Sequence, residues 1–378
     1  MSLATLALRS TKRFDIVENG GVAVLTELSM TPDDDVISMS CAATFVFLSK
    51  EPSLRVQISD EHCLAALLFL LQSPHIDVKK DCCRALCNLC LIDGFERRVI
   101  KEGVAGMVLP IVKKAHDVVE VCLKLLLNLS CVNEKFLRLE EVTATLVELY
   151  HMYHRSEEEE LLLMQGLCNL SSLRGFHYHL VEEGLLAVIE KASISTVKRC
   201  HVIASECLKN LSTCPRTRGK LIDFNVMKLL VVILTNETID VRINCLNTFF
   251  NFCMDSSCVS KVASTQVLHS VIVMCLTSTS VALCRSLARL MKILCSYPSI
   301  AAKLIQDRVI AAFEHITEHT TKCASSIHFC AEALRFLYSN AMFHSALHAQ
   351  SALSLLLNLS NRCSSPVTRE VSTKDLIC

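Results

Sequence analysis

The stretch Ala85-Leu-Cys-Asn-Leu89 decides the fold, because close copies of it recur along the chain at a nearly constant step. In each copy an asparagine stands between large apolar residues. The copies lie at residues 126–129, 167–170, 208–211 and 249–252. Their asparagines are Asn88, Asn128, Asn169, Asn210 and Asn251. A fixed period of about 40 residues is the signature of an internal repeat.

The same step extends beyond the asparagines in both directions. One step before Leu89 lies the stretch Phe45-Val-Phe-Leu48, and one step after Phe252 lies Leu290-Met-Lys-Ile-Leu294. A looser copy is Ala333-Leu-Arg-Phe-Leu337. In this register Phe47 and Lys292 take the asparagine position. The repeats are therefore expected to continue past the series of asparagines.

A second marker runs in phase with the first. Gly21, Gly103 and Gly184 each precede a new apolar run, and each interval between them is two repeats long. Asn225 holds the next such position, and asparagine tolerates the left-handed backbone that ends helices. We expect each of these residues to separate two helices.

Apolar residues within one unit follow the spacing of a helix. In residues 118–129, Val118, Val121, Cys122, Leu125 and Leu129 lie on one helical face. A similar run fills residues 104–114, after Gly103. Two such helices in about 40 residues fit the size class of armadillo and HEAT repeats. About eight full repeats are predicted, with a partial ninth that begins at Ser351.

Composition supports helices and argues against a nucleic-acid binder. The 378 residues include only 9 Gly and 7 Pro, too few for the many turns of an all-β fold. Lys and Arg number 38, as do Asp and Glu, so the formal net charge is zero. The global basic field of a nucleic-acid-binding domain is absent.

The 22 cysteines are interpreted as buried thiols rather than a disulfide framework. Many of them, such as Cys122, Cys207 and Cys245, occupy apolar helical positions. We therefore expect a reducing compartment, the cytoplasm, with the nucleus as an alternative. Val262–Cys284 lacks charged residues, but a polar run over residues 277–280 interrupts it, so no membrane span is predicted.

The repeat unit resembles the armadillo repeat. An entry glycine is followed by a second helix of the kind Val108-Leu-Pro-Ile-Val112 and by a third helix that ends Ala85-Leu-Cys-Asn-Leu89. The resemblance implies an all-α fold, a right-handed superhelical solenoid of armadillo-type repeats. It covers residues 14–362. Residues 1–13 are expected to form an N-terminal segment, and residues 363–378 a tail or a truncated repeat.

The resemblance also implies where a partner binds. In armadillo proteins the third helices line a concave groove, and their asparagines bond the backbone of an extended peptide. An amide suits this task because it both donates and accepts. The carry-over is to Asn88, Asn128, Asn169, Asn210 and Asn251. The alternative is that each asparagine satisfies the end of its own helical turn.

Charged and polar residues flank the asparagines on the same helical faces. Arg84, Lys124 and Asn247 lie four residues before an asparagine, on the face that it shares. Arg285, Arg289 and Lys292 form a second basic stripe. These six residues join the asparagines as candidates for contact with a partner, although ordinary solvated charge explains a basic stripe equally well.

These features favour a non-enzymatic, cofactor-free scaffold or adaptor that holds an extended or helical segment of a partner protein. A karyopherin-like transport adaptor is an alternative, but the chain has no Trp to stack on basic cargo. A structural component of a cytoskeletal or ciliary assembly is another. Nothing in the sequence identifies the partner or the oligomeric state.

A metal-dependent hydrolase is the remote alternative. His315-Ile-Thr-Glu-His319 matches an inverted zinc-protease pattern and puts two imidazoles on one helical face. His344 and His348 form another pair at helical spacing. The first segment falls where the repeat predicts an ordinary second helix, so no metal ligand is assigned.

Asn128, Asn169 and Asn210 each begin the triplet Asn-Leu-Ser, which is also a glycosylation sequon. We interpret these matches as coincidental, because all three fall inside predicted helices.

Overall fold

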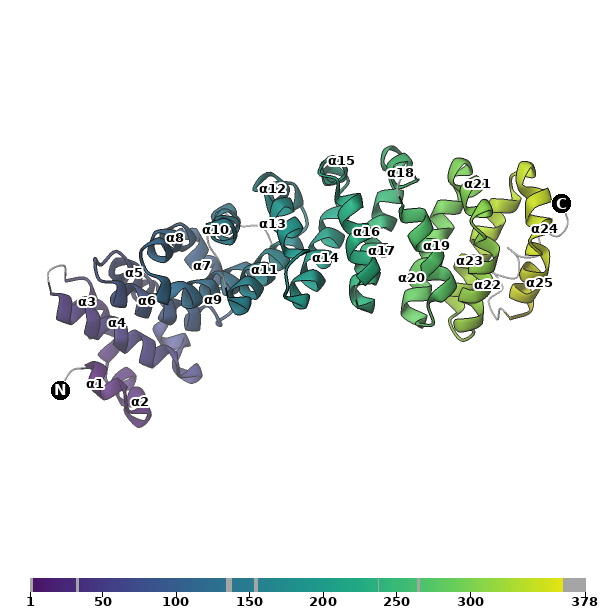
Figure 1. The fold of residues 1–378 in the computed structure, drawn as a ribbon. Coiled ribbons are helices and arrows are strands. Elements are labelled where there is room, and N and C mark those ends of the chain that lie inside the picture. The colour runs from purple at the N-terminus through teal and green to yellow at the C-terminus, as the bar shows by residue number, and fades with distance from the viewer. Residues whose placement is uncertain are drawn as a thin grey trace. The chain divides into compact units, whose positions relative to one another are not determined.

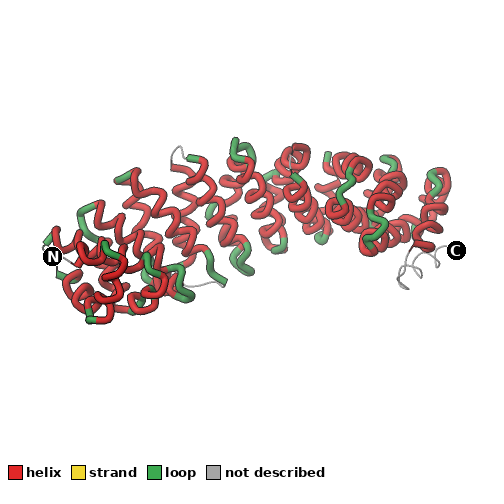
Figure 2. The backbone as a smooth tube through the Cα atoms, turned by 90° about the horizontal axis from the view of Figure 1, so that it is seen from below, coloured by secondary structure: helices red, strands yellow, loops and turns green. Residues whose placement is uncertain are grey.

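The computed structural model describes residues 3–31, 34–133, 138–152, 156–236, 238–263 and 266–362. Within these ranges the elements are helices joined by short links, with no β-strand (Figure 2). The chain divides into two compact units, residues 1–188 and 189–378, and each is described by itself.

The first unit is a stack of helices whose bounds, in chain order, are as follows. They are α1 (Leu3–Ala7), α2 (Ser10–Glu18), α3 (Gly21–Ser29), α4 (Asp35–Ser49), η1 (Pro52–Leu54), η2 (Val56–Ile58), α5 (Glu61–Leu71), α6 (Ile76–Leu89), α7 (Phe95–Lys101), α8 (Val104–Lys114), η3 (His116–Val118), α9 (Val119–Ser130), α10 (Leu139–Met152), α11 (Glu157–Ser171) and α12 (His177–Glu182). The η elements are single 3-10 turns.

Helix α13 (Leu185–Ala192) starts in the first unit and ends in the second. The second unit then continues with the elements α14 (Lys198–Ser212), α15 (Pro215–Asp223), α16 (Val226–Asn236), α17 (Ile239–Cys253), α18 (Ser256–Ala263), α19 (Val267–Thr277), α20 (Val281–Cys295), α21 (Pro298–Gln306), α22 (Val309–His319), α23 (Ala324–Tyr338), η4 (Ala341–Phe343), α24 (His344–Ala349) and α25 (Ala352–Arg362).

One long helix closes each repeat, and we call these the third helices. In the first unit they are α4, α6, α9 and α11, each packed against the next. In the second unit they are α14, α17, α20 and α23, also packed in order, whereas the short first helices α15, α18 and α21 lie along the opposite edge (Figure 1). The second helices α16, α19 and α22 pack in a series of their own.

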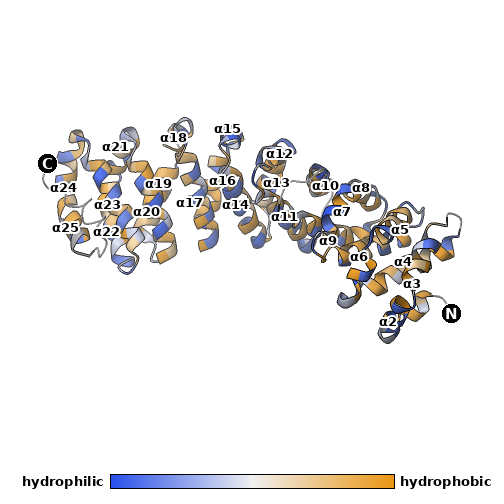
Figure 3. Cartoon of the chain, turned by 180° about the vertical axis from the view of Figure 1, so that it is seen from behind, coloured by the Kyte–Doolittle hydropathy of each residue, from blue (hydrophilic) through white to orange (hydrophobic). Residues whose placement is uncertain are grey.

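The residues that flank each asparagine build the core. Leu86 and Leu89 on α6, and Phe249 and Phe252 on α17, are fully buried. Figure 3 shows that the helices differ in hydropathy. Helices α16 and α19 are mostly hydrophobic, whereas the first helix α15 is mostly hydrophilic. Burial of leucine and phenylalanine at one recurring position stabilises the stack by about 1.5–3 kcal/mol per side chain.

Helix bounds fix the register of the third helices. Asn169, Asn210 and Asn251 are each the thirteenth residue of α11, α14 and α17. We call this position, and Asn88 and Asn128 at the matching places on α6 and α9, the ladder position. The thirteenth residue of α20 is Ile293, and that of α23 is Phe336. The constant step of the sequence pattern put Lys292 there. Helix α20 begins 42 residues after α17, one more than the 41 between α14 and α17, which moves the position by one residue to Ile293.

A left-handed residue separates first and second helices at most junctions, as the second marker predicts. Gly103, Gly184 and Asn225 have φ values of 73°, 94° and 64°. At the first junction the left-handed residue is Gly20, with φ 75°, and not Gly21. Gly21 is the first residue of α3, where an added Cβ would lie 2.5 Å from the main-chain oxygen of Ile16. Non-glycine residues, such as Arg308 with φ 65°, serve at other junctions.

The all-α class is confirmed for the described residues. Helix α2 begins at Ser10, ahead of residue 14, where the repeats were expected to start. The expected tail, residues 363–378, lies outside the described residues. Among the described residues no single helix is long and apolar enough to cross a membrane. Helices α18 and α19 pass that test only when taken together, and they are bent by 75°.

Candidate functional site

The ladder asparagines are half-buried, and four of them bond to the repeat before, namely Asn88, Asn128, Asn169 and Asn251. Asn88 Nδ2 donates to Ser49 Oγ over 3.0 Å, Asn169 Nδ2 to Ser130 Oγ over 3.0 Å, and Asn251 Nδ2 to Ser212 Oγ over 2.9 Å. The accepting serines are themselves buried. The amide therefore has a structural role between repeats. This role agrees in part with the alternative interpretation, in which the asparagines serve the fold rather than a ligand.

Asn128 makes the same kind of bond to a different acceptor. The residue that matches the accepting serines is Cys90, so Asn128 Nδ2 turns to the main-chain oxygen of Cys87, 3.0 Å away. The Cys87 Sγ lies 3.3 Å from the same nitrogen. The contact between repeats is thus kept when its serine is missing, which indicates that it matters to the stack.

The accepting serines are the residues that sequence reasoning missed. Ser130 and Ser212 are the last residues of the Asn-Leu-Ser triplets that begin at Asn128 and Asn210. In each, the serine accepts from the asparagine of the following repeat. The recurrence of Asn-Leu-Ser was the signal in the sequence, and its cause is this bond between repeats.

Part of each amide stays unused by these bonds. Among the described contacts, the Oδ1 atoms of Asn88, Asn128 and Asn251 accept no hydrogen bond, whereas Asn169 Oδ1 accepts from Gln165 Nε2 over 3.1 Å. An asparagine amide has two N–H donors and one carbonyl acceptor. A bound strand can therefore use the rest of the group while the inter-repeat bond holds it in place.

In each unit, the side of the third helices that carries the ladder also carries predicted cations, and we call it the third-helix surface of that unit. Residues four before the ladder position recur on it. They are Arg84, Lys124, Gln165, Glu206, Asn247, Arg289 and Glu332, all exposed or half-buried. The corrected register thus adds Arg289 to the series that begins with Arg84 and Lys124.

The two predicted cations of the first unit, Arg84 and Lys124, each form an ion pair with an acidic residue of the same helix. Arg84 Nη1 lies 3.0 Å from Asp81 Oδ1, on the same helix. Lys124 Nζ lies 2.5 Å from Glu120 Oε1, and this hydrogen bond raises the pKa of Lys124. The predicted basic character of this region is therefore largely cancelled, because each cation has an acid of its own.

The cations of the second unit are arranged differently. Lys292 is paired with Glu332 on the next third helix, which also lies 3.2 Å from His328 Nε2. Arg289 stacks over the ring of Phe250, with its guanidinium carbon 3.7 Å from the ring centroid. Partial burial lowers the pKa of Arg289, and the like charge of Arg285 lowers it further.

The histidines of the hydrolase pattern lie on the second helix α22. The rings of His315 and His319 stack with centroids 4.2 Å apart, and His319 Nδ1 lies 2.9 Å from the main-chain oxygen of His315. Within the described ranges, no three His, Cys, Asp or Glu side chains lie close enough together to hold a metal ion.

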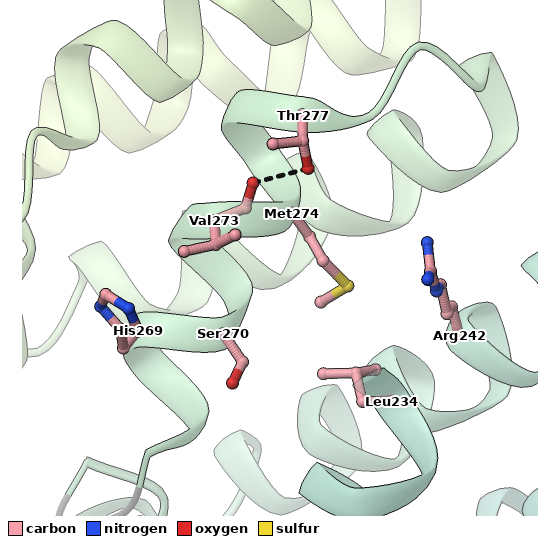
Figure 4. Close-up of a pocket in the computed structure, with 7 residues that line it drawn as sticks. All are labelled: Leu234, Arg242, His269, Ser270, Val273, Met274 and Thr277. Atoms are coloured by element: carbon pink, nitrogen blue, oxygen red, sulfur yellow. Dashed lines mark hydrogen bonds between the residues drawn. The ribbon is translucent and has the colours of Figure 1, made fainter. Parts of the chain in front are cut away.

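A cavity of about 340 Å³ lies in the second unit, between α16, α17 and α19 (Figure 4). It is lined by Leu234, Arg242, His269, Ser270, Val273, Met274 and Thr277. None of the predicted site residues lines it. The cavity is therefore distinct from the third-helix surface.

The cysteines behave as core residues. All 20 that the structure describes are free thiols, and 16 of them are buried. Burial raises the pKa of most of them, for example that of Cys245 to about 12. Cys83 and Cys122 approach to 4.0 Å between sulfur atoms, with both side chains buried.

Comparison with known proteins agrees with this architecture. Residues 52–91, which contain α6 and Asn88, match the family model of the Armadillo/beta-catenin-like repeat. None of the curated proteins compared with the chain matches it. The resemblance to armadillo repeats is thus confirmed for residues 52–91.

Solved structures show the same fold. The crystal structure of an engineered protein is similar over 99% of this chain and 92% of its own, with a TM-score of 0.75 and 20% identity. A designed armadillo repeat protein in complex with the peptide (KR)4 is similar over 60% of this chain and 98% of its own, with a TM-score of 0.51 and 16% identity. At these identities the likeness concerns the fold.

Proposed function

We propose that the chain is a non-enzymatic scaffold or adaptor whose third-helix surface holds an extended segment of a partner protein. The observation that carries the proposal is the ladder itself. Asn88, Asn128 and Asn251 hold their amides in place by a bond to the preceding repeat and keep a free carbonyl oxygen. Such pre-positioned groups bind a ligand at low entropic cost.

An extended peptide suits this arrangement because its backbone offers a donor and an acceptor at every residue. A segment of about 12 residues spans roughly 40 Å, and neighbouring packed helices lie about 10 Å apart. One segment can therefore reach several ladder positions. The designed armadillo protein solved with (KR)4 shows that this fold accommodates a short peptide, which supports the proposal.

The free and mostly buried cysteines support a reducing compartment. We therefore propose the cytoplasm, or the nucleus, as the place where the chain works.

Two matched triple variants test the proposal. Peptides of about 12 residues are selected from a random library on the full chain, and their affinities are measured by fluorescence anisotropy. The ladder variant is Asn88→Ala, Asn169→Ala, Asn251→Ala. The control is Ser49→Ala, Ser130→Ala, Ser212→Ala, which removes the bonds that these serines accept from the ladder asparagines but keeps every ladder amide.

Both variants should lose stability, at about 0.5–1.5 kcal/mol per bond. Only the ladder variant should lose most of its peptide affinity, by about tenfold or more. If the library yields no binding peptide, or if both variants lose affinity equally, the asparagines serve the stack alone and the proposal fails.

A further inference from the structure

Helix α20 carries two arginines one turn apart on the third-helix surface. Arg285 and Arg289 are both exposed, and α20 itself contains no acidic residue. Among the described residues neither arginine forms an ion pair with a carboxylate. Like charges at this spacing repel each other on a helix. The pair is therefore an uncompensated positive patch.

Several other cations on the third-helix surface do not share this property, although Arg335 on α23 also has no ion pair among the described residues. Arg84 is paired with Asp81, Lys124 with Glu120, and Lys292 with Glu332. Arg285 and Arg289 differ from these three cations because no acidic partner accompanies them.

The neighbouring third helices do not supply the missing acid. The only acidic residue of α17 is Asp240, in its first turn, and no ion pair joins it to either arginine. The only acidic residue of α23 is Glu332, which is held by Lys292 and His328. A carboxylate that neutralises the arginine pair must therefore come from outside these helices.

Arg289 packs against an aromatic ring of the preceding third helix. Its guanidinium carbon lies 3.7 Å from the centroid of the Phe250 ring, an arrangement stabilised by cation–π attraction. Partial burial and the charge of Arg285 disfavour its charged form. A bound anion would offset both effects, and a guanidinium is built to take a carboxylate with two parallel hydrogen bonds.

We infer that Arg285 and Arg289 bind the carboxylate side chains of an acidic segment in the partner protein. The inference rests on the proposed function, since it gives the bound segment its chemistry. The acidic residues of that segment lie over α20, one repeat beyond Asn251, where the ladder position holds Ile293 and offers no amide. Beyond Asn251, the bound segment is therefore recognised by its charge rather than by its backbone.

The test compares three labelled peptides of one length, about 12 residues. Every second residue is aspartate in the first, asparagine in the second and lysine in the third. Their affinities for the full chain are measured by fluorescence anisotropy at low ionic strength. The variant is Arg285→Gln, Arg289→Gln. The control is Lys228→Gln, Lys303→Gln, which removes two exposed charges of the same unit from α16 and α21.

The wild-type chain and the control should bind the aspartate peptide about tenfold more tightly than the asparagine peptide. The arginine variant should bind these two peptides about equally. Equal binding of all three peptides to the wild type overturns the inference and leaves the proposed function standing. Equal losses in the arginine variant and the control also overturn it. Failure of every peptide to bind contradicts both proposals.

Discussion

The side-chain amide of a ladder asparagine has more hydrogen-bonding groups than its inter-repeat bond uses. Asn251, for example, donates to Ser212 Oγ and keeps its carbonyl oxygen. The residue thus stabilises the stack and remains available to a ligand. The binding affinity of a ladder variant therefore has to be compared together with its stability, because the same amide serves both.

The chemistry of the acceptor decides what an aspartate does at the ladder position. In Asn251→Asp the Ser212 hydroxyl can turn from the main-chain oxygen of Lys209, to which it donates over 2.7 Å, and donate to the new carboxylate. The carboxylate would still face that Lys209 oxygen, which Asn251 Nδ2 bonds over 3.4 Å. In Asn128→Asp the carboxylate faces the main-chain oxygen of Cys87, which cannot donate. We expect Asn128→Asp to lower the free energy of unfolding by about 1–3 kcal/mol and Asn251→Asp by less. Urea titrations of the two variants check this, and equal losses would contradict the assigned bonds.

Cys323 is the cysteine best placed to react. Burial acts to raise its pKa, but hydrogen bonds with Ser325 and Ser326 outweigh it and lower the pKa. Burial raises the pKa of Cys131, which is the most exposed thiol described. Because the thiolate is the reactive form, Cys323 should already be labelled by iodoacetamide at a pH where Cys131 reacts slowly. Mass spectrometry locates the label, with Cys323→Ser as the control. Faster labelling of Cys131 would contradict the assigned environments.

At the scale of the helix, the junction residues set where one element ends and the next begins. The pattern of glycines predicted these junctions, and Asn225 was identified correctly as a left-handed residue. The choice between Gly20 and Gly21 was wrong because both are glycines, and sequence alone does not show which one begins α3. Arg308 was invisible to the pattern, since an arginine carries no mark of a positive φ.

Two glycines test the role of the junctions as a matched pair. Gly184 has φ 94°, and an added Cβ would meet nothing closer than 3.8 Å, so Gly184→Ala changes only the backbone energy. Gly219 lies inside α15 with open space around it. We expect Gly184→Ala to destabilise by about 1–2 kcal/mol and Gly219→Ala to stabilise by about 0.5–1 kcal/mol. Urea unfolding should shift in opposite directions, and a shift in the same direction would rule out this explanation.

Register shows the limit of the sequence at the scale of the element. A constant step located the third helices through α17, because α11, α14 and α17 begin 41 residues apart. Helix α20 begins 42 residues after α17, which moved the ladder position from Lys292 to Ile293. Local length changes of this kind leave the apolar pattern intact. Only the observed start of the helix resolves them.

At the scale of the molecule, the repeat class could be predicted because the core residues repeat with the helices that bury them. Leu89 and Phe252 are fully buried at the same place in their repeats. The pairing of Lys124 with Glu120 follows the i,i+4 spacing of one helix and was open to prediction from the sequence. The stacking of Arg289 on Phe250 could not be predicted, because it joins two helices through side-chain conformations that a period does not specify.

The central claim is that the ladder amides bond the backbone of an extended partner segment, and backbone methylation tests it most directly. A peptide selected on the full chain is compared with a copy methylated at alternate backbone nitrogens, so that all side chains stay the same. Affinities are measured on the wild type and on Asn88→Ala, Asn169→Ala, Asn251→Ala. We predict that methylation weakens binding to the wild type by about tenfold or more and binding to the ladder variant far less, because the two changes remove the same bonds. Equal losses on both proteins, or no loss on either, would contradict the claim.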